Sequence, residues 1–177
     1  MKTIEKVTKK PKITVLICTL NEEGSLPYVL SKIPEWADEV LLVDGHSSDN
    51  TAELAKRLHT NIRILYQPGI GKGDALKYGF KRAQGDIIVT LDADGATDPE
   101  EIPRFIEPLL KGYDFAKGSR FRGNFPRNKY WYRILGSWLI TITFDVLFFR
   151  KYSDLCSGYN AFWLKSIEQV DLSTPDG

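Results

Sequence analysis

The chain has 177 residues, of which 42% are hydrophobic and 27% are charged, values that suit one globular domain with a substantial core. This composition argues against a chain that is disordered throughout. The formal net charge of +1 gives no reason to expect a nucleic-acid partner. The two cysteines, Cys18 and Cys156, are too few for a disulfide framework or a zinc site, so we expect free thiols in a reducing, cytoplasmic compartment.

A basic tail is expected at residues 1–11, because lysines dominate this segment with only Glu5 against them. No apolar run follows Met1, so we predict no secretory signal. Residues 12–177 are then expected to form the folded domain.

Apolar, β-branched segments alternate with helix-forming segments over the first two thirds of the chain. We predict strands at residues 13–18, 40–43, 62–66, 87–91 and 113–117. We predict helices at residues 25–36, 52–58, 75–83 and 100–110, the second capped by Ser48 or Asp49. This alternation indicates an α/β fold, with a mainly parallel, doubly wound sheet and helices on both faces.

Residues 130–149 break the alternation and predict one long aromatic and aliphatic helix. Its apolar run is shorter than the roughly 20 residues that span a bilayer, and Asp145 interrupts it, which argues against a transmembrane helix. Packing against the sheet or against a second copy in a homo-oligomer is the favoured role. A position at a membrane surface is the alternative, because basic and aromatic residues flank the segment.

Asp92 and Asp94 directly follow the apolar strand at residues 87–91. Ligands of open parallel sheets bind at the carboxyl edge, where two such carboxylates can reach a hard cation such as Mg²⁺ or Mn²⁺. Acidic pairs of this kind also occur in ordinary turns and helix caps, and Asp98 with Pro99 is an example of a helix start just downstream.

Asp44 ends another predicted strand, so its carboxylate is expected at the same edge as Asp92 and Asp94. Two of these groups can bind a metal diphosphate, and the third can accept hydrogen bonds from a ribose or a base. Lys72 lies in a glycine-flanked loop that opens a helix, where amides, helix dipole and ammonium can face an anion. The residues after Lys72 do not fit the phosphate-binding P-loop, which disfavours an ATPase or kinase of that type.

A cluster of cations without one acidic residue between them lies at residues 117–133. It consists of Lys117, Arg120, Arg122, Arg127, Lys129 and Arg133. These cations repel one another unless they are solvated or face anions, so we expect phosphate binding here.

Five segments, in order, resemble the family 2 inverting nucleotide-sugar glycosyltransferases, which have a Rossmann-like GT-A fold. Four of them are VLICTLNEE at residues 15–23, VDGHSSDNT at 43–51, GKGDAL at 71–76 and LDAD at 91–94. The fifth, DLCSGYNAF at 154–162, is similar to the acceptor-side segment of polyprenyl-phosphate sugar synthases such as dolichol-phosphate mannosyltransferase. The resemblance implies metal-dependent transfer of a hexose from a nucleotide diphosphate sugar to a polyprenyl phosphate.

For the donor, the resemblance implies a nucleoside pocket lined by Thr19, Asn21, Glu22 and Asp44. Lys72 would approach the nucleotide, Asp92 would contact the ribose or the diphosphate, and Asp94 would be the principal ligand of Mg²⁺ or Mn²⁺. The donor stays open among GDP-mannose, UDP-glucose and UDP-GlcNAc, because Cys18 and Leu20 stand where Pro and Tyr are common in the family.

The resemblance implies that Arg120 meets the acceptor phosphate or the diphosphate, and we assign Arg120 and Arg122 to the acceptor phosphate. A lipid phosphate is already ionised near neutral pH, whereas a hydroxyl acceptor needs a base, for which Asp154 is the candidate. Asp154 is equally compatible with capping or with pairing to a neighbouring cation. His46 lies in a turn beside the predicted site, whereas His59 suits a surface or capping position.

Such a lipid acceptor places the protein at the inner face of a membrane as a peripheral protein. The chain ends in what resembles a loop, and relatives usually continue, so we expect the natural protein to extend beyond Gly177. The alternatives are transfer to a hydroxyl acceptor and a non-catalytic nucleotide-binding module. A dehalogenase-type phosphatase is disfavoured because its acidic pair follows the first strand, and a nucleotidyltransferase because its first loop is glycine-rich and basic.

Overall fold

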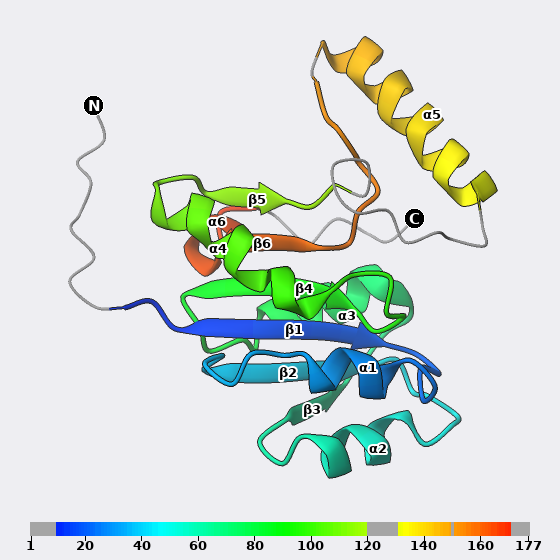
Figure 1. Cartoon of the computed structure of the whole chain (residues 1–177), viewed down its shortest axis with the longest axis vertical. Helices are drawn as coiled ribbons and strands as arrows, with labels where there is room; N and C mark the ends of the chain where they lie inside the picture. Colours follow the sequence, from blue (N-terminus) through cyan, green and yellow to red (C-terminus); the bar gives the residue numbers. More distant parts are fainter. Residues whose placement is uncertain (1–9, 120–130, 150, 171–177) are drawn as a thin grey trace.

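The computed structural model describes residues 10–119, 131–149 and 151–170, with side chains from residue 136 onward in the second of these ranges (Figure 1). Its strands are β1 (Ile13–Thr19), β2 (Glu39–Asp44), β3 (Arg63–Tyr66), β4 (Ile87–Asp92), β5 (Phe115–Lys117) and β6 (Asn160–Trp163). Its helices are α1 (Leu26–Ser31), α2 (Thr51–Leu58), α3 (Gly71–Phe80), the 3-10 helix η1 (Pro99–Glu101), α4 (Ile102–Leu110), α5 (Trp131–Phe148) and α6 (Leu164–Ile167).

The six strands form one sheet in the order β3-β2-β1-β4-β6-β5. Strands β1 to β4 are parallel to one another, whereas β6 runs antiparallel to both of its neighbours, β4 and β5. The predicted α/β fold with a mainly parallel sheet is therefore confirmed.

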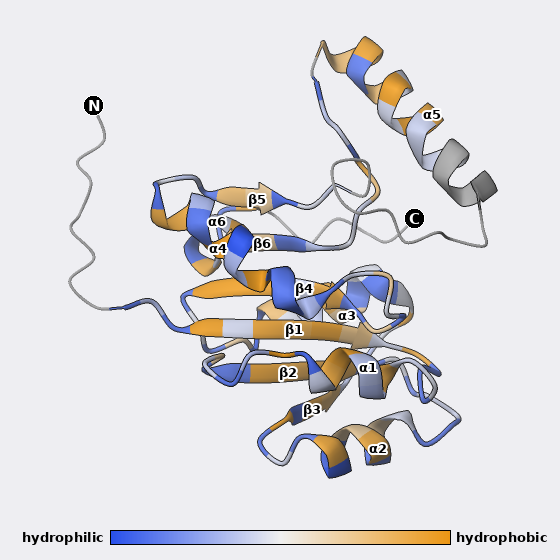
Figure 2. Cartoon of the chain, in the orientation of Figure 1, coloured by the Kyte–Doolittle hydropathy of each residue, from blue (hydrophilic) through white to orange (hydrophobic). Residues whose placement is uncertain are grey.

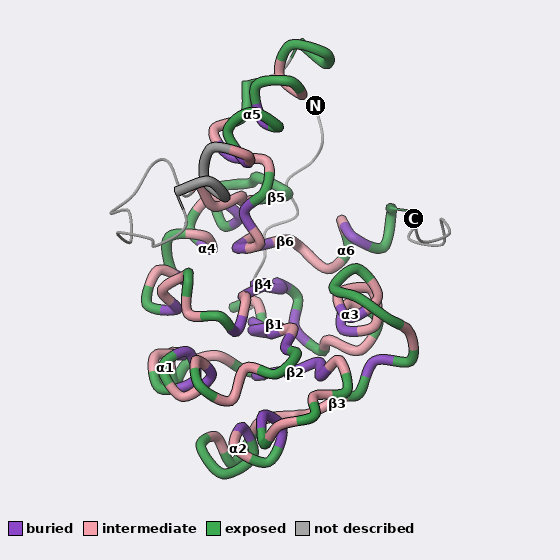
Figure 3. Tube along the Cα trace, turned by 90° about the vertical axis from the view of Figure 1, so that its right-hand side faces the viewer, coloured by how far each residue is buried: buried purple, intermediate pink, exposed green. Residues whose placement is uncertain are grey.

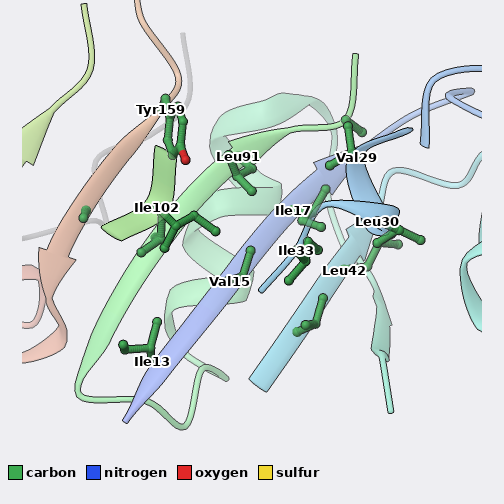
Figure 4. Close-up of a cluster of buried hydrophobic side chains, with 14 of the residues drawn as sticks. Ile13, Val15, Ile17, Val29, Leu30, Ile33, Leu42, Leu91, Ile102 and Tyr159 are labelled. Atoms are coloured by element: carbon green, nitrogen blue, oxygen red, sulfur yellow. The ribbon is translucent and has the colours of Figure 1, made fainter. Parts of the chain in front are cut away.

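Strand β1 lies in the middle of this sheet, and its residues are apolar along most of its length (Figure 2). Every residue from Ile13 to Ile17 is buried, as expected for a parallel strand that is covered on both sides. Helices indeed cover both faces of the sheet (Figure 3). On one face, α1, α2 and α4 pack over a cluster of buried side chains that includes Ile17, Leu42 and Leu91 (Figure 4). On the other face, α3 and α6 cover a smaller cluster around Leu16.

Three local predictions need correction. The first helix ends at Ser31 rather than Trp36, because the residue before Pro34 is disfavoured in helical conformation. Lys72 lies in the first turn of α3, which begins at Gly71, rather than in the loop before it. Strand β6 is absent from the sequence prediction, although it fills the position between β4 and β5.

The long helix predicted at residues 130–149 is confirmed as α5, and it extends away from the sheet in two perpendicular views (Figures 1 and 3). Its exposed apolar side chains include Trp138, Leu139, Ile140, Ile142, Val146, Leu147 and Phe148. The expected packing of this helix against the sheet is therefore not seen. Within the described ranges, no helix has the length and apolar character needed to cross a membrane.

Candidate functional site

A cavity of about 570 Å³ opens at the carboxyl edge of the sheet. It lies where the strand register aligns the ends of three strands, with Thr19 opposite Asp44 and Cys18 opposite Asp92. The cavity is lined by Cys18, Thr19, Leu20, Glu22, Gly45, His46, Gln67, Gly69, Ile70, Gly71, Lys72, Ala75, Asp92, Ala93 and Asp94. Five residues predicted from the sequence thus share one cavity: Thr19, Glu22, Lys72, Asp92 and Asp94.

An ion pair joins two of the charged groups of this cavity, the Lys72 ammonium and the Asp92 Oδ1 carboxylate oxygen. The pair links the first turn of α3 to the end of β4, and both side chains remain partly exposed. Asp94, two residues further on, is exposed and accepts a 2.9 Å hydrogen bond from the Ala96 backbone N–H. None of the ion pairs among the described residues involves Asp94, so its carboxylate retains capacity to bind a cation.

Two residues that the resemblance assigns to the nucleoside pocket, Asp44 and Asn21, do not line the cavity. Asp44 is 1% exposed, and its two carboxylate oxygens accept hydrogen bonds from the Ser47 backbone N–H and hydroxyl, both at 2.7 Å. The side-chain oxygen of Asn21 accepts a 2.7 Å hydrogen bond from the Ser48 backbone N–H. Both residues therefore hold the loop after β2 in place.

Two residues near the cavity have left-handed backbone conformation, Asn21 at φ 56° and His46 at φ 64°. Such conformations cost free energy outside glycine and are concentrated at functional sites. The Asn21–Ser48 contacts and a 2.9 Å hydrogen bond from the Asn21 backbone N–H to the Ser47 hydroxyl hold the first of these turns. The His46 turn thus lines the cavity, and the hydrogen-bonded Asn21 turn lies beside it.

His46 has a larger part in the cavity than its sequence context indicates. Its Nε2 lies 2.8 Å from the Gln67 carbonyl oxygen, and because a carbonyl only accepts, Nε2 carries the hydrogen. Its ring stacks against Tyr66 with the centroids 6.0 Å apart. Gln67 is not among the residues predicted from the sequence, although it follows β3 at the same sheet edge as the predicted carboxylates.

Cys18 lines the cavity, one strand away from Asp92. Burial of the thiol raises the pKa of Cys18 to about 12; the nearby Lys72 ammonium opposes this rise, and the Asp92 carboxylate adds to it. The Cys18 thiol is therefore a neutral, apolar part of the wall.

The predicted acceptor-side residues fall into two groups. Arg120 and Arg122 lie outside the described residues. Asp154 is 1% exposed and does not line the cavity, and its Oδ1 accepts a 3.0 Å hydrogen bond from the Cys156 backbone N–H. This contact agrees with the capping role that is the alternative to a catalytic base.

The model of the family described as "Glycosyl transferase family 2" matches residues 14–171. The chain belongs to this family. A curated relative from Proteus mirabilis (strain HI4320), undecaprenyl-phosphate 4-deoxy-4-formamido-L-arabinose transferase, is 38% identical over 79% of this chain and 44% of its own length. Glycosyltransferase AglJ of Haloferax volcanii is 31% identical over 93% of this chain and 54% of its own length.

A solved structure with the same fold is glucosyl-3-phosphoglycerate synthase from Mycobacterium tuberculosis, in complex with Mn²⁺, UDP and phosphoglyceric acid. It matches 88% of this chain and 56% of its own chain with a TM-score of 0.71 and 24% sequence identity. This likeness confirms the GT-A fold predicted for a family 2 glycosyltransferase. The chain spans about half the length of the relatives described here.

Within the described part of this family 2 chain, no group of three or more His, Cys, Asp or Glu side chains is arranged to hold a metal ion. The residues present nevertheless fit Mg²⁺ or Mn²⁺. Such cations are commonly held by one or two carboxylates together with the phosphates of a substrate and water. Asp92 and Asp94 supply that number of carboxylates in the cavity lining.

Proposed function

We propose that this chain transfers a hexose, with inversion, from a nucleoside diphosphate sugar to a polyprenyl phosphate, using Mg²⁺ or Mn²⁺. In this proposal residues 12–177 are the GT-A catalytic domain, preceded by the tail at residues 1–11. One observation carries it: Lys72, Asp92 and Asp94 line the same cavity at the carboxyl edge of a family 2 sheet. The names of the curated relatives support a polyprenyl phosphate as the acceptor class.

On the donor side, Asp92 and Asp94 would hold the cation, and the Lys72 ammonium lies beside Asp92 at the start of α3. When bound, the divalent cation supplies Lewis-acid stabilisation of the charge that develops on the leaving nucleoside diphosphate. The first-turn amides of α3 add favourable interaction with the same anion. The nucleoside contacts Thr19, Glu22 and His46. These residues lie next to the loop after β2, which hydrogen bonds to Asp44 and Asn21 hold in place.

On the acceptor side, the polyprenyl phosphate oxygen attacks the anomeric carbon in one in-line displacement, which inverts the configuration. Because a phosphate monoester is ionised near neutral pH, no catalytic base is needed. The burial of Asp154 outside the cavity lining supports this simpler scheme over transfer to a hydroxyl. Arg120 and Arg122 bind the acceptor phosphate in this proposal, because guanidinium donors match phosphate oxygens in geometry.

A calorimetric titration tests the proposal. GDP, UDP, GDP-mannose, UDP-glucose, UDP-GlcNAc and a UDP-linked pentose are titrated into the chain with Mn²⁺ present and again with a chelator. The pentose is included because the Proteus mirabilis relative is named for an arabinose derivative. Binding of one nucleotide family that the chelator abolishes is the expected result, and hydrolysis of that donor separates an enzyme from a non-catalytic module. No metal-dependent binding of any nucleotide contradicts the proposal.

The location of the protein follows from the acceptor. A polyprenyl phosphate resides in a membrane, so the chain would act as a peripheral protein at the inner face. Homo-oligomerisation through residues 130–149 remains our prediction for the exposed helix α5. Sedimentation velocity with and without mild detergent tests it: a dimer that persists in detergent supports the prediction, and a monomer under both conditions contradicts it.

A further inference from the structure

Gly158 brings the segment before β6 directly against the Lys72–Asp92 ion pair. A Cβ atom at Gly158 would lie 2.8 Å from Lys72 Nζ and 3.0 Å from Asp92 Cγ, and closer still to Asp92 Oδ2. Cβ atoms do not approach other heavy atoms this closely in proteins, so only glycine fits while the pair stays in place. Gly158 lies 68 residues beyond Thr90 of β4 in the sequence, so this proximity arises only from the fold.

The requirement for glycine comes from space and not from backbone conformation. Gly158 is not among the glycines with positive φ, which in the described ranges are Gly71, Gly95 and Gly112. Alanine is therefore compatible with the Gly158 backbone. The atoms that its methyl group would meet are the ends of two side chains, which can move without disrupting the sheet.

Hydrogen bonds and ring stacking hold the backbone on both sides of Gly158. This segment therefore has little freedom to move away from the Lys72–Asp92 ion pair. Its carbonyl oxygen accepts a 2.9 Å hydrogen bond from the Thr90 hydroxyl of β4, two residues before Asp92. The Ser157 carbonyl oxygen accepts a 2.9 Å hydrogen bond from Lys117 Nζ of β5. Tyr159, 3% exposed, stacks on Phe105 with ring centroids 3.9 Å apart. A methyl group at Gly158 must therefore displace the ends of the paired side chains.

We propose that Gly158 is a positioning residue for the donor site: its missing side chain lets residues 157–159 close against the Lys72–Asp92 pair and hold the ammonium on the carboxylate. The inference rests on the proposed function for the identity of the ligand, a nucleoside diphosphate with a divalent cation. It also gives the segment at residues 154–162 a direct contact with the donor side of the cavity.

Three alanine variants separate this role from a general effect on folding. Gly158→Ala is the test. Gly85→Ala is the structural control, because its Cβ would lie 2.6 Å from the Thr14 backbone nitrogen, away from the cavity, where backbone must shift. Gly136→Ala, on α5, is the neutral control, because its Cβ would meet no atom of the described residues within 4 Å.

Two readouts are measured on the whole chain for each variant. The first is the rate at which acetic anhydride modifies Lys72, followed by mass spectrometry without any ligand. The second is the affinity for Mn²⁺ together with UDP or GDP. For Gly158→Ala we expect several-fold faster modification of Lys72 and about tenfold weaker nucleotide binding, since returning a displaced side chain to its position beside the nucleotide then costs about that much in an unfavourable rotamer. The melting temperature should stay near that of the wild type, whereas Gly85→Ala should lower it and leave Lys72 modification unchanged.

A further variant tests the contact itself. In a Lys72→Ala background, Gly158→Ala should weaken nucleotide binding less than it does in the wild type, because one of the two displaced groups is already gone. Unchanged Lys72 modification in Gly158→Ala overturns the inference whatever the nucleotide result. A wild-type chain that binds no nucleotide overturns the proposed function instead, and the Lys72 modification rates still decide whether Gly158 holds the ion pair.

Discussion

The region from β1 to β5 and the region from α5 to α6 differ in how they use apolar residues. In the first region, strands such as β1 and β4 bury nearly every side chain beneath helices on both faces. In the second region, α5 leaves large side chains exposed, among them Trp138 at 49% and Phe148 at 59%. The same apolar character thus gives a closed core in one place and an open surface in the other.

This difference in exposure matches the division of the proposed reaction into a donor half and an acceptor half. The cavity proposed for the donor is formed by strand ends whose positions the sheet fixes, and its loops are held by hydrogen bonds such as the one from Ser47 to Asp44. The segment at residues 154–162, proposed for the acceptor side, approaches that cavity through Gly158, and the exposed helix α5 precedes it in the chain (Figure 1). We therefore expect that a change of surroundings that alters the structure of the second region leaves the structure of the first region unchanged.

The two cysteines give the largest expected contrast between the regions. Because burial raises the pKa of Cys18 to about 12 from an ordinary value of 9.0, its thiolate at pH 8 should be about a thousandfold scarcer than that of an ordinary thiol. Cys156 is exposed. We expect iodoacetamide at pH 8 to label Cys156 rapidly and Cys18 far more slowly, as read by mass spectrometry. Labelling of both at similar rates in the folded chain contradicts the raised pKa of Cys18.

The same thiol affects stability at high pH. The unfolded chain releases the Cys18 proton near pH 9, whereas the folded chain holds it to about pH 12. The unfolded state therefore binds fewer protons in this window, and the free energy of unfolding should fall between pH 9 and pH 12. A Cys18→Ala variant should show a shallower loss over that range in urea titrations, and an equal loss would mean that other groups cause it.

Matched leucine truncations compare the packing of the two regions. Leu42→Ala in β2 removes a side chain that is 0% exposed and should lower the free energy of unfolding by about 3 kcal/mol. Leu147→Ala in α5 removes one that is 66% exposed and should change it by less than about 0.5 kcal/mol. Urea denaturation measures both. A large loss from Leu147→Ala would mean that α5 is covered in solution.

Much of the first region can be predicted from the sequence, because its signals are local. An apolar run followed by Asp92 and Asp94 predicts both a buried strand and a polar strand end, and the structure has both. Strand β6 is not predicted because its four residues make a weak local pattern, and its partners in β5 lie 43 to 47 residues earlier in the sequence. The approach of Gly158 to Lys72 and Asp92 escapes prediction for the same reason, since only the folded sheet brings them together.

Site residues that act through their neighbours are the hardest to predict. Asp44 ends a strand and is therefore expected in the cavity lining, but Ser47 satisfies its carboxylate from the following turn. His46 and Gln67 become recognisable as cavity residues only when the ends of β2 and β3 are brought together. Strand-end position therefore predicts the edge of the sheet on which a side chain lies, but not the direction in which it points.

Substitution of Asp94, one of the two carboxylates in the acidic pair, tests the proposed donor region. Asp94→Asn should lower metal-dependent turnover by about a hundredfold, because the amide lacks the charge that binds the cation. The fold should persist, since Asp94 is exposed and Asn can still accept the hydrogen bond from the Ala96 N–H. Asp114→Asn, an exposed carboxylate outside the cavity lining, is the matched control. Full turnover in Asp94→Asn contradicts the assignment of Asp94 as a metal ligand.

The arginines predicted at the acceptor phosphate should give a smaller and more selective effect. Replacing Arg120 and Arg122 with Ala should raise the KM for a polyprenyl phosphate by about tenfold, the size expected for lost charge-assisted hydrogen bonds, and leave the Kd for the nucleotide unchanged. Arg104→Ala, which removes an exposed cation from α4, is the control. If donor binding weakens as much as acceptor use, the arginines serve the diphosphate, and the division between a donor region and an acceptor region does not hold at this segment.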